Sequence, residues 1–435
     1  MKNAHSNVQN GAKLRTEALT MAKTDAMDSN TVELQGYRSR RLKILSLSTE
    51  YPNPVEPGKG LFVHARLQSI ATGADLTVIA PVAVLDYANP EGRLLASFTI
   101  PKSRTDHGIR VFHVRWLYPP LGGWLNAFFL YLRLLLPVAR LRLNHAVDLI
   151  DAHFTHPEGI AAALLGRTLD IPVMITMRGS ELRYQRHRLK RVWMAWALRR
   201  AERVITVSDG LRALAVALGA DPSAVKTVPN GINNDIFFRR DHEACRRIHD
   251  IPKDALVVLS AGDLARLKGH HRVVEALRSL VDEGLPAYLL IAGGVGRSGQ
   301  YAATLRMRVT ELGLEDKVRF VGMASQNTLA ELMSAAGVFC LASASEGWPN
   351  VVNEALACGT PVVATDVGAV RQMLPSGQFG TVVPVDDTPS LRAALREALT
   401  RAWDHAAISN WGRSRSWDQV AKEVLEEAAQ AAAHV

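Results

Sequence analysis

The chain has 435 residues, of which 48% are hydrophobic and 21% charged, and its formal net charge is +9. This length predicts two or three domains, and the apolar content is ordinary for a soluble globular protein. The positive charge suits an anionic nucleotide or an anionic membrane surface. The interleaved basic and aromatic residues of a nucleic-acid-binding module are missing, so we expect no nucleic acid partner. The cysteines lack metal or redox spacing, which favours a reducing cytoplasm; they are Cys245, Cys340 and Cys358.

Residues 1–41 are polar, poor in aromatic side chains and without apolar periodicity. They also lack the apolar core of a signal peptide. We therefore expect a mobile tail, with Met21 and Met27 as alternative start positions.

From Leu42 onward, short apolar runs alternate with segments of helical periodicity. We predict strands over residues 42–47, 76–80, 148–152, 173–176 and 203–207, with helices between them such as 61–72. Strands that alternate with helices form a parallel sheet covered on both faces. The most apolar stretch, Leu125–Val138, is too short to span a bilayer and is interrupted by Arg133, so we expect a buried or interfacial helix there.

A second set of elements follows Val228-Pro229-Asn230-Gly231. We predict strands over residues 256–261, 288–292, 318–321, 338–341, 361–365 and 381–383, with helices such as 269–283 and 390–400 between them. The sequence therefore predicts an α/β protein with two doubly wound domains in tandem. Ligands bind such sheets beyond the carboxyl ends of their strands, so we expect the site in the cleft where the two domains face each other.

The most informative stretch is residues 345–361, Ser-Glu-Gly-Trp-Pro-Asn-Val-Val-Asn-Glu-Ala-Leu-Ala-Cys-Gly-Thr-Pro, between two apolar runs. Glu346 falls in a loop, because Gly347 and the following proline forbid regular structure. Glu354 falls on a short helix that Asn350 can cap. Free amides at a helix N-terminus can hold a phosphate. A carboxylate beside them can accept hydrogen bonds from sugar or ribose hydroxyls.

This stretch resembles the E-x7-E signature of retaining, sugar-nucleotide-dependent glycosyltransferases of family 4, which have the GT-B fold. The resemblance covers residues 42–433 and is strongest over 228–365. It implies that Glu354 binds the ribose of the nucleotide and that Glu346 lies beside the donor sugar. By the same resemblance, further donor-binding residues are Gly347, Asn350 and Val351.

Residues 260–270 resemble the family segment G-R-L-x-x-x-K-G, in which an Arg and a Lys hold the donor diphosphate. Lys268 matches this Lys, but Asp263 stands at the Arg position. Arg266, in the same loop, is the candidate substitute. Two alternatives remain open: Asp263 pairs with Arg266 and so rebuilds the two-cation clamp, or Asp263 marks a catalytically silent protein.

Residues 294–299 match the G-x-G-x-x-G dinucleotide fingerprint, but they follow the second strand of their domain and no acid ends the next strand. We therefore expect no nicotinamide cofactor. The family has a glycine-rich loop here, which implies that Gly293 and Gly294 approach the nucleotide closely. Met323 ends the next strand, where the family reads the base.

In the first domain, residues 177–182 resemble the family element H-G-x-D, with Arg178 and Glu181 in place of His and Asp. The family element faces the transferred sugar, and His153 lies in a loop similar to its neighbour. Gly60 follows the first strand, where a glycine lets the backbone approach ligands; an ordinary loop is the alternative. We assign these four residues to the acceptor side.

His153 and His156 have the spacing of metal ligands, but no cysteine or acid cluster completes a site, so we predict no metal. Residues 182–204 are rich in Arg and Lys and contain Trp193 and Trp196. This pattern is typical of a basic amphipathic helix on a membrane surface, with a solvated helix face as the alternative.

Together, the resemblance implies a GT-B hexosyltransferase with two Rossmann-like domains. Residues 42–232 form the acceptor side, 411–435 return to it, and 233–410 bind the nucleotide sugar. We expect a UDP- or GDP-sugar as donor, transfer with retention, no metal or other cofactor, and a glycan or lipid-linked acceptor. The protein is expected in the cytoplasm, in peripheral contact with the inner face of the plasma membrane. The alternatives are a catalytically silent partner subunit and a GT-B sugar-nucleotide epimerase.

Overall fold

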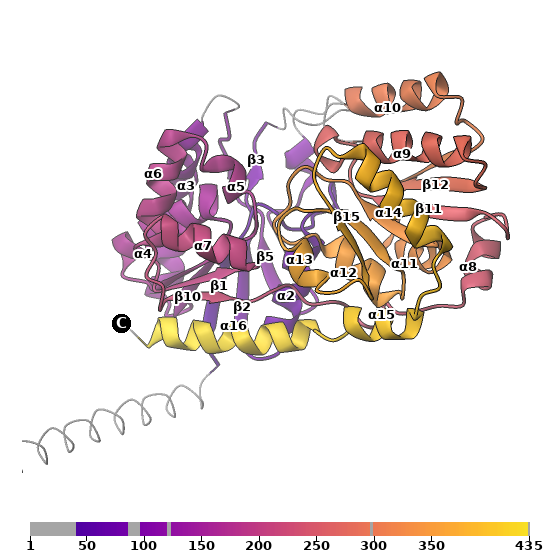
Figure 1. Cartoon of the computed structure of the whole chain (residues 1–435). Helices are drawn as coiled ribbons and strands as arrows, with labels where there is room; N and C mark the ends of the chain where they lie inside the picture. Colours follow the sequence, from indigo (N-terminus) through magenta and orange to yellow (C-terminus); the bar gives the residue numbers. More distant parts are fainter. Residues whose placement is uncertain (1–40, 86–95, 120–122, 296–298, 434–435) are drawn as a thin grey trace, which may run out of the picture.

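The computed structural model describes residues 41–85, 96–119, 123–295 and 299–433. They form two α/β domains, each with a mainly parallel sheet and helices on both faces (Figure 1). The predicted α/β fold with two doubly wound domains is confirmed. The mobile tail predicted over residues 1–41 lies, except for Arg41, outside the described residues.

The first sheet has eight strands in the order β10-β9-β8-β7-β1-β2-β5-β4, and all neighbours are parallel except β4 and β5. The inner strands are apolar runs buried on both faces. Three strands of this sheet were not predicted from the sequence. β10 is short, and β4 and β5 form a hairpin at the edge of the sheet, in which β4 is polar. The strands are β1 (Lys43–Leu47), β2 (Asp75–Ile79), β4 (Ser103–Asp106), β5 (Ile109–Phe112), β7 (Leu149–His153), β8 (Val173–Met177), β9 (Arg203–Thr206) and β10 (Val225–Thr227). A separate two-stranded sheet pairs β3 (Val82–Ala83) with β6 (Arg115–Trp116).

One face of the first sheet packs against α2 (Leu61–Ile70) and α16 (Trp417–Ala432). The other face packs against α3 (Asn126–Leu143), α4 (Ile160–Leu169), α6 (Arg188–Leu198) and α7 (Asp209–Ala217). The C-terminal helix α16 thus runs along the first domain after the chain has left the second (Figure 1). Arg203 Nε donates a hydrogen bond of 2.6 Å to Glu427 Oε2 and ties α16 to β9.

The second sheet is wholly parallel, in the order β13-β12-β11-β14-β15-β16. Its strands are β11 (Leu256–Ala261), β12 (Ala287–Ala292), β13 (Val318–Gly322), β14 (Val338–Leu341), β15 (Val362–Thr365) and β16 (Gly380–Val383). Its helices are α8 (His242–Ile248), α9 (His270–Asp282), α10 (Gln300–Glu311), α11 (Gln326–Ala335), α12 (Asn350–Ala357), α13 (Val370–Met373), α14 (Thr388–Thr400) and α15 (His405–Gly412). Strands and helices lie within two or three residues of the predicted ranges.

Two predicted helices differ in detail from the structure. The apolar helix α3 continues to Leu143, so the helical segment Gly123–Leu143 is long and apolar enough to cross a membrane by length and composition. One stripe of α3, including Leu130, Leu134 and Val138, is nevertheless fully buried in the core of the first domain. The single basic helix predicted over residues 182–204 is instead a one-turn helix, α5 (Glu181–Tyr184), followed by α6, and its last basic residue starts β9.

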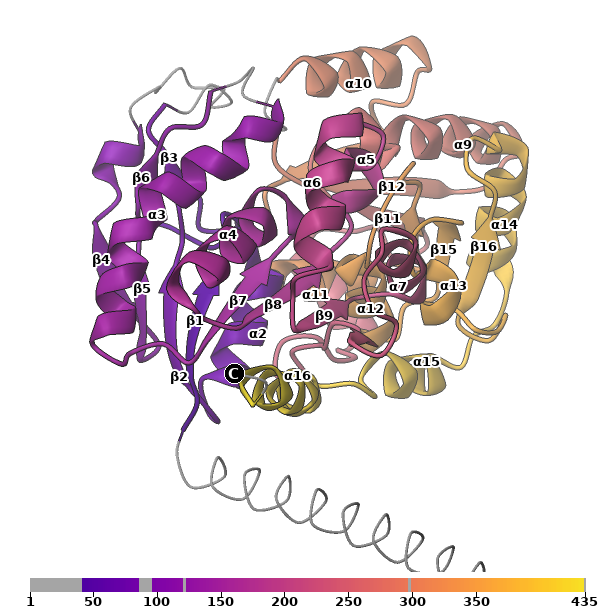
Figure 2. The ribbon, with the colours of Figure 1, turned by 90° about the vertical axis from the view of Figure 1, so that its left-hand side faces the viewer.

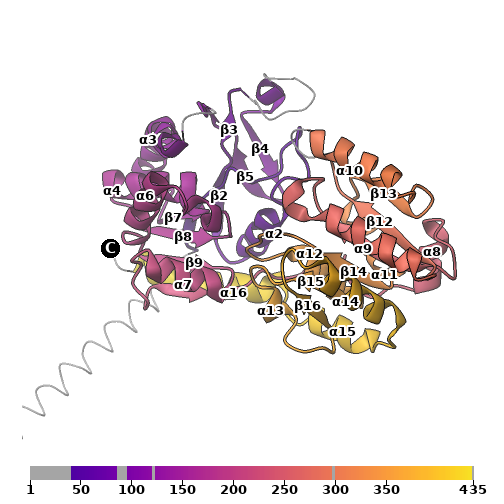
Figure 3. The ribbon, with the colours of Figure 1, turned by 45° about the horizontal axis from the view of Figure 1, so that its top comes forward.

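The strand orders locate the ligand-binding edge of each domain. The order reverses between β1 and β7 in the first sheet and between β11 and β14 in the second. Ligands of doubly wound sheets bind at such reversals, beyond the carboxyl ends of the strands. The loops there are 48–60 and 154–159 in the first domain, and 262–269 and 342–349 in the second. Figure 3 shows α12, which follows the last of these loops, on the side of the second domain nearest α2.

Candidate active site

Lys268 and Glu346 meet at the strand reversal of the second sheet. Lys268 Nζ donates a hydrogen bond of 2.7 Å to Glu346 Oε1, and Ser343 Oγ donates one of 2.8 Å to the same oxygen. Both side chains stay partly accessible, with exposed fractions of 30% for Lys268 and 13% for Glu346. The structure therefore joins two of the three predicted catalytic residues in a pair that a ligand can reach.

The third predicted catalytic residue, Arg266, stands apart from this pair. Arg266 and Asp263 are both exposed in the loop after β11. In the described part of the chain, no ion pair joins Asp263 to Arg266, and no hydrogen bond joins Arg266 to Lys268 or Glu346. The expected pairing of Asp263 with Arg266 is thus not present, and the loop leaves the Arg266 side chain at the surface.

Glycines let the loops around Lys268 pack directly on one another. Gly269 has a φ of 72°, and a Cβ there would overlap the Ala342 carbonyl oxygen. A Cβ on Gly293 would overlap the Gly262 carbonyl oxygen. Gly293, predicted to approach the nucleotide, is therefore required by the neighbouring loop, whether or not a ligand is bound.

Gly294 and Met323 are neighbours at the rim of the second domain. A Cβ on Gly294 would meet the Met323 Cε at 3.6 Å, which is ordinary contact. The Met323 side chain is 79% exposed just beyond β13. Gly294, predicted to approach the nucleotide, and Met323, predicted to lie where the base is read, are therefore neighbours in the structure.

Helix α12 begins at Asn350, but Asn350 does not cap it, so the predicted cap is wrong. Pro349 is the N-cap residue and provides no side-chain hydrogen bond. The Asn350 Oδ1 instead accepts a hydrogen bond of 3.0 Å from Asn230 Nδ2, in the segment that joins the two domains. The first-turn amides of α12 are consequently not occupied by a side-chain cap, and Val351 lies half-buried in that turn.

Glu354 lies one turn into α12, with part of its side chain still accessible. Burial of the carboxyl raises its pKa to about 7. No hydrogen bond from another described residue reaches this carboxylate. An acceptor without a partner at this depth is suited to a neutral hydroxyl donor such as ribose.

Gly347 touches the first domain directly. A Cβ on Gly179, in the loop after β8, would lie 2.7 Å from the Gly347 Cα, and a Cβ on Gly347 would overlap the Arg178 carbonyl oxygen. The loop that carries Glu346 is therefore held against the loop that follows β8. Gly347, predicted to bind the donor, has at least this second reason to be glycine.

Glu181, predicted on the acceptor side, is fully buried, and its carboxylate accepts hydrogen bonds from main-chain amides. Its carboxylate accepts hydrogen bonds from the Thr155 amide at 2.9 Å and from the Gly179 amide at 2.8 Å. It thereby joins the loops after β7 and β8. The structure places Glu181 beneath the acceptor side and not at its surface.

His153 and Arg178 form the floor of the same region. Arg178 Nη2 lies 2.8 Å from the His153 Nδ1, and the His153 Nε2 lies 3.1 Å from Asp151 Oδ2. Because a guanidinium only donates, the Nδ1 must be the acceptor and the imidazole carries its proton on Nε2. Burial lowers the pKa of His153 to about 4, so the ring is neutral. Arg178 is 7% exposed and stacks over the Phe62 ring at 5.2 Å.

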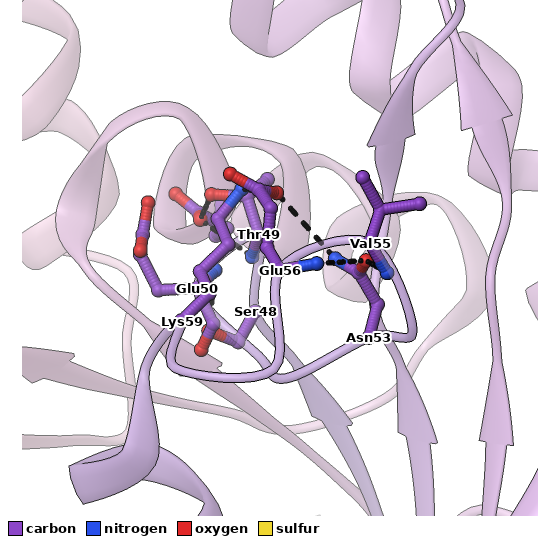
Figure 4. Close-up of polar contacts among 8 residues, drawn as sticks. Ser48, Thr49, Glu50, Asn53, Val55, Glu56 and Lys59 are labelled. Carbon is purple, nitrogen blue, oxygen red and sulfur yellow. Dashed lines mark hydrogen bonds and ion pairs between the residues drawn. The ribbon is translucent and has the colours of Figure 1, made fainter. Parts of the chain in front are cut away.

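The loop after β1 is folded by its own side chains (Figure 4). The Asn53 Oδ1 accepts hydrogen bonds from the Val55 and Glu56 amides at 2.9 and 3.0 Å. Lys59 Nζ lies 3.1 Å from Glu56 Oε2. Gly60 closes the loop with a φ of 62°, and a Cβ there would overlap the Glu50 carbonyl oxygen. Gly60 therefore allows close approach of backbone to backbone.

Glu158 is a buried carboxyl that no sequence motif marks as a site residue. It accepts hydrogen bonds from the Thr49 amide, at 2.9 Å, and from the Thr49 hydroxyl, while its Oε2 has no partner among the described residues. Burial raises its pKa to about 7. Glu158 links the loops after β1 and β7, and only its segment, not the residue itself, was marked by the motif around His153.

Among the residues that the structure describes, one group of side chains could hold a metal ion: the ligand atoms of His64, Asp106 and His107 lie within 4.8 Å of one another. They lie beside the edge strand β4. Arg104 Nη2 is 3.0 Å from the Asp106 carboxylate, so a dication there would face a guanidinium that already neutralises its carboxylate ligand.

Comparisons with known proteins agree with the geometry. The family model described as "Glycosyltransferase Family 4" matches residues 70–236, and "Glycosyl transferases group 1" matches residues 241–415. The "Putative teichuronic acid biosynthesis glycosyltransferase TuaC" of Bacillus subtilis (strain 168) is 30% identical over 377 residues, which are 84% of this chain and 90% of that protein. A D-inositol 3-phosphate glycosyltransferase of Geodermatophilus obscurus is 34% identical over 225 residues, 48% of this chain and 50% of the relative.

Solved structures show the same fold. A sucrose-phosphate synthase from Thermosynechococcus elongatus superposes with a TM-score of 0.72 at 21% identity, covering 89% of this chain and 98% of that chain. Anabaena Alr3699/HepE, in complex with UDP and glucose, superposes with a TM-score of 0.69 at 20% identity, covering 89% and 99%. With both domains matched and one relative aligned over most of its length, this chain belongs to the family 4 glycosyltransferases with the GT-B fold.

Proposed function

We propose that the protein transfers a hexose from a UDP- or GDP-sugar to a glycan or lipid-linked acceptor, with retention at the anomeric carbon and without a metal or other cofactor. The observation that carries the proposal is the accessible pair of Lys268 and Glu346 beside α12. The name of the Bacillus subtilis relative, which refers to teichuronic acid biosynthesis, supports a glycan product. The cytoplasm, where nucleotide sugars are available, is the proposed location.

Each residue has a distinct role in this reaction. The Lys268 ammonium has three N–H groups. One donates a hydrogen bond to Glu346, so two remain for the diphosphate of the nucleotide sugar. The start of α9, directly after Gly269, adds helix amides that favour an anion. The Glu346 Oε1 accepts hydrogen bonds from Lys268 and Ser343, and its Oε2 is the proposed acceptor for a sugar hydroxyl. Glu354 binds the ribose, while Gly294 and Met323 contact the base.

In the transfer step, the bond between the sugar C1 and the diphosphate oxygen breaks. An acceptor hydroxyl oxygen bonds to C1 on the same face, and its proton passes to the departing diphosphate. Lys268 and the helix amides stabilise the charge that develops on the leaving group. Arg266, exposed on the same loop, is the candidate second cation once a donor is bound.

A catalytically silent partner subunit is the second candidate, because Asp263 is exposed and unpaired with Arg266 in the described chain. Titration with UDP-, GDP- and ADP-sugars, followed by assay of nucleotide diphosphate release, tests both candidates. Binding with release supports the transferase. Binding of the same donors without release, in the presence of a range of glycan acceptors, supports the silent subunit.

Peripheral membrane contact also belongs to the proposal, but with different contact residues from those first expected. Trp193 stacks on Trp124 with centroids 6.4 Å apart and packs against the core, so it is not a free anchor. The exposed stripe of α3 contains instead Leu132, Leu136 and Leu143, Leu125 is exposed directly before this helix, and α6 exposes Leu189 and Val192. We call these six residues the α3–α6 face; both helices lie on the side of the first domain shown in Figure 2.

The charge of these two helices suits an anionic lipid surface. Neither α3 nor α6 contains an acidic residue, and their basic residues are Arg133, Arg140, Arg142, Arg188, Lys190 and Arg191. Exposed leucines among cations are the composition of interfacial helices. A surface contact here would place the acceptor side near a lipid-linked acceptor, which is why we include it in the proposed function.

A further inference from the structure

A line of hydrogen bonds crosses from the floor of the first domain to the first turn of α12. Arg178 Nη1 donates to Asn230 Oδ1 over 3.3 Å, and Asn230 Nδ2 donates to Asn350 Oδ1 over 3.0 Å. Asn230 lies between β10 and α8, in the segment that joins the domains, and is 4% exposed. These contacts are not used by the transfer chemistry described above.

The partners of Asn230 determine the orientation of its amide. A guanidinium has donors only, so the Asn230 oxygen must face Arg178 and its NH₂ group must face Asn350. Arg178 is itself held, because it donates to His153 and stacks over Phe62. Asn230 therefore connects a rigid point of the first domain to a defined position on α12.

The same place carries the direct contact between the domains. Gly179 follows Arg178 and touches Gly347, while Asn350 begins α12 three residues later. Glu354 lies one turn further along α12. A change in the Asn230 contacts would thus alter the position of Glu354 relative to the acceptor side without touching a ligand.

We infer that Asn230 is a positioning residue that sets α12, and with it Glu354 and the bound donor, against the acceptor side of the first domain. This inference rests on the proposed function, in which α12 is the helix that binds the nucleotide sugar. Since the nucleotide site lies within the second domain, Asn230 should affect turnover and leave the affinity for the bare nucleotide unchanged.

The test compares the Asn230→Ala, Asn350→Ala and double variants with a matched control, Asn234→Ala. Asn234 lies four residues further along, and within the described ranges its side chain bonds only to Arg413, at the C-terminal end of α15. Each single variant in the line should lower kcat about 3- to 10-fold, the usual effect of one hydrogen bond. The double variant should lose no more than the worse single variant. In Asn230→Ala, whose side chain is not among the predicted donor-binding residues, the dissociation constants for UDP and GDP, from calorimetry, should stay within about twofold of wild type, and Asn234→Ala should keep its kcat.

Asn230→Asp provides the rescue. Its carboxylate still accepts from Arg178, and the Asn350 amide can rotate to donate to it, so kcat should return to within about threefold of wild type. A merely destabilising position would not show this recovery. Multiplicative losses in the double variant, or full activity in Asn230→Ala, would overturn the inference.

A second measurement keeps the inference separate from the proposed function. Hydrogen exchange of the amides in α12 should be faster in Asn230→Ala than in wild type and unchanged in Asn234→Ala. If wild type turns over no donor, the proposed function fails, and this exchange result alone decides whether Asn230 positions α12. Equal exchange in all three proteins would refute it.

Discussion

The Lys268 ammonium and the Glu346 carboxylate are joined at 2.7 Å across two loops that lie 78 residues apart in the chain. The pair connects the cation proposed for the diphosphate to the acid proposed for the sugar. When a nucleotide sugar binds, the N–H groups of Lys268 must therefore be shared between the Glu346 carboxylate and the phosphates. Removal of either side chain should affect the other.

The first prediction concerns the cations. Lys268→Ala should lower turnover about 10²- to 10³-fold, as the loss of a charge-stabilising donor does. Arg266→Ala should lower it less, because Arg266 is exposed and no contact orients it in the described structure. Steady-state rates of nucleotide diphosphate release provide the measurement. Comparable losses in both variants would show that Arg266 turns inward and completes a two-cation clamp.

The second prediction is a pH dependence of donor binding. Burial raises the pKa of Glu354 to about 7, and the ionised form is the better acceptor for ribose hydroxyls. Affinity should therefore rise between pH 6 and pH 8 as the carboxyl loses its proton. Glu354→Gln should bind more weakly at pH 8 and should lose this part of the pH dependence. Calorimetry with a nucleotide sugar tests it; identical pH profiles in the two proteins would contradict the ribose assignment.

The third prediction concerns stability at Glu158. Its pKa is raised by burial to about 7, so the folded protein binds this proton more tightly than the unfolded chain does. The contribution of this group to stability is complete below the unfolded pKa, near 4.5, and is lost as the pH rises toward 7. Glu158→Gln should therefore raise the melting temperature relative to wild type more at pH 8 than at pH 5.

Glu181→Gln is the control. Glu181 accepts hydrogen bonds from several amides, so its substitution should destabilise the protein at both pH values. An equal shift for Glu158→Gln at both pH values would argue against a neutral carboxyl.

The fourth prediction tests the contact between the domains. In Gly347→Ala, the new methyl group would overlap the Arg178 carbonyl oxygen and force the two loops apart. Turnover should fall at least tenfold, because the acceptor side and the Glu346 loop separate, whereas UDP and GDP affinities should change little. Gly377→Ala is the matched control, since a Cβ there meets nothing within 4 Å. Unchanged rates in Gly347→Ala would show that the contact is dispensable.

The fifth prediction addresses the membrane. Wild type should sediment with vesicles that contain anionic lipid and should be released by salt, because each basic residue near the surface contributes about 1 kcal/mol. The double variant Leu132→Glu and Leu136→Glu should lose this binding and retain donor hydrolysis. Ile248→Glu, on α8 and 63% exposed, is the control and should bind as wild type does. Retained vesicle binding in the double variant would exclude the α3–α6 face.

Much of this architecture is predictable because buried parallel strands are continuous apolar runs, as in Leu256–Ala261. The resemblance to family 4 assigned Lys268 and Glu346 to one donor site, and the structure joins them after neighbouring strands at a reversal of the sheet. The partners of polar side chains do not follow from sequence. Asn350 has the composition of a helix cap, yet an amide 120 positions away binds its oxygen.

Glu158 shows the same limit. Burial raises the pKa of Glu158, whereas the hydrogen bonds from Thr49, 109 positions away, oppose that rise, and neither effect is a local property of the sequence. Arg178 shows the same limit. The motif reveals that Arg178 replaces a family histidine, but only the structure shows its hydrogen bonds to His153 and Asn230. Local pattern determines elements, whereas long-range packing determines which polar atoms remain available to a ligand.

The central claim is that this site releases a nucleotide diphosphate from a sugar donor through Lys268. The most direct measurement is the rate of release from UDP- and GDP-hexoses, in excess EDTA and with a glycan acceptor present, for wild type and Lys268→Ala. We expect release by wild type from at least one donor without added metal, and release at least 100-fold slower in Lys268→Ala, because a charge-stabilising group is lost. Donor binding without release by wild type, or equal rates in the two proteins, would contradict it.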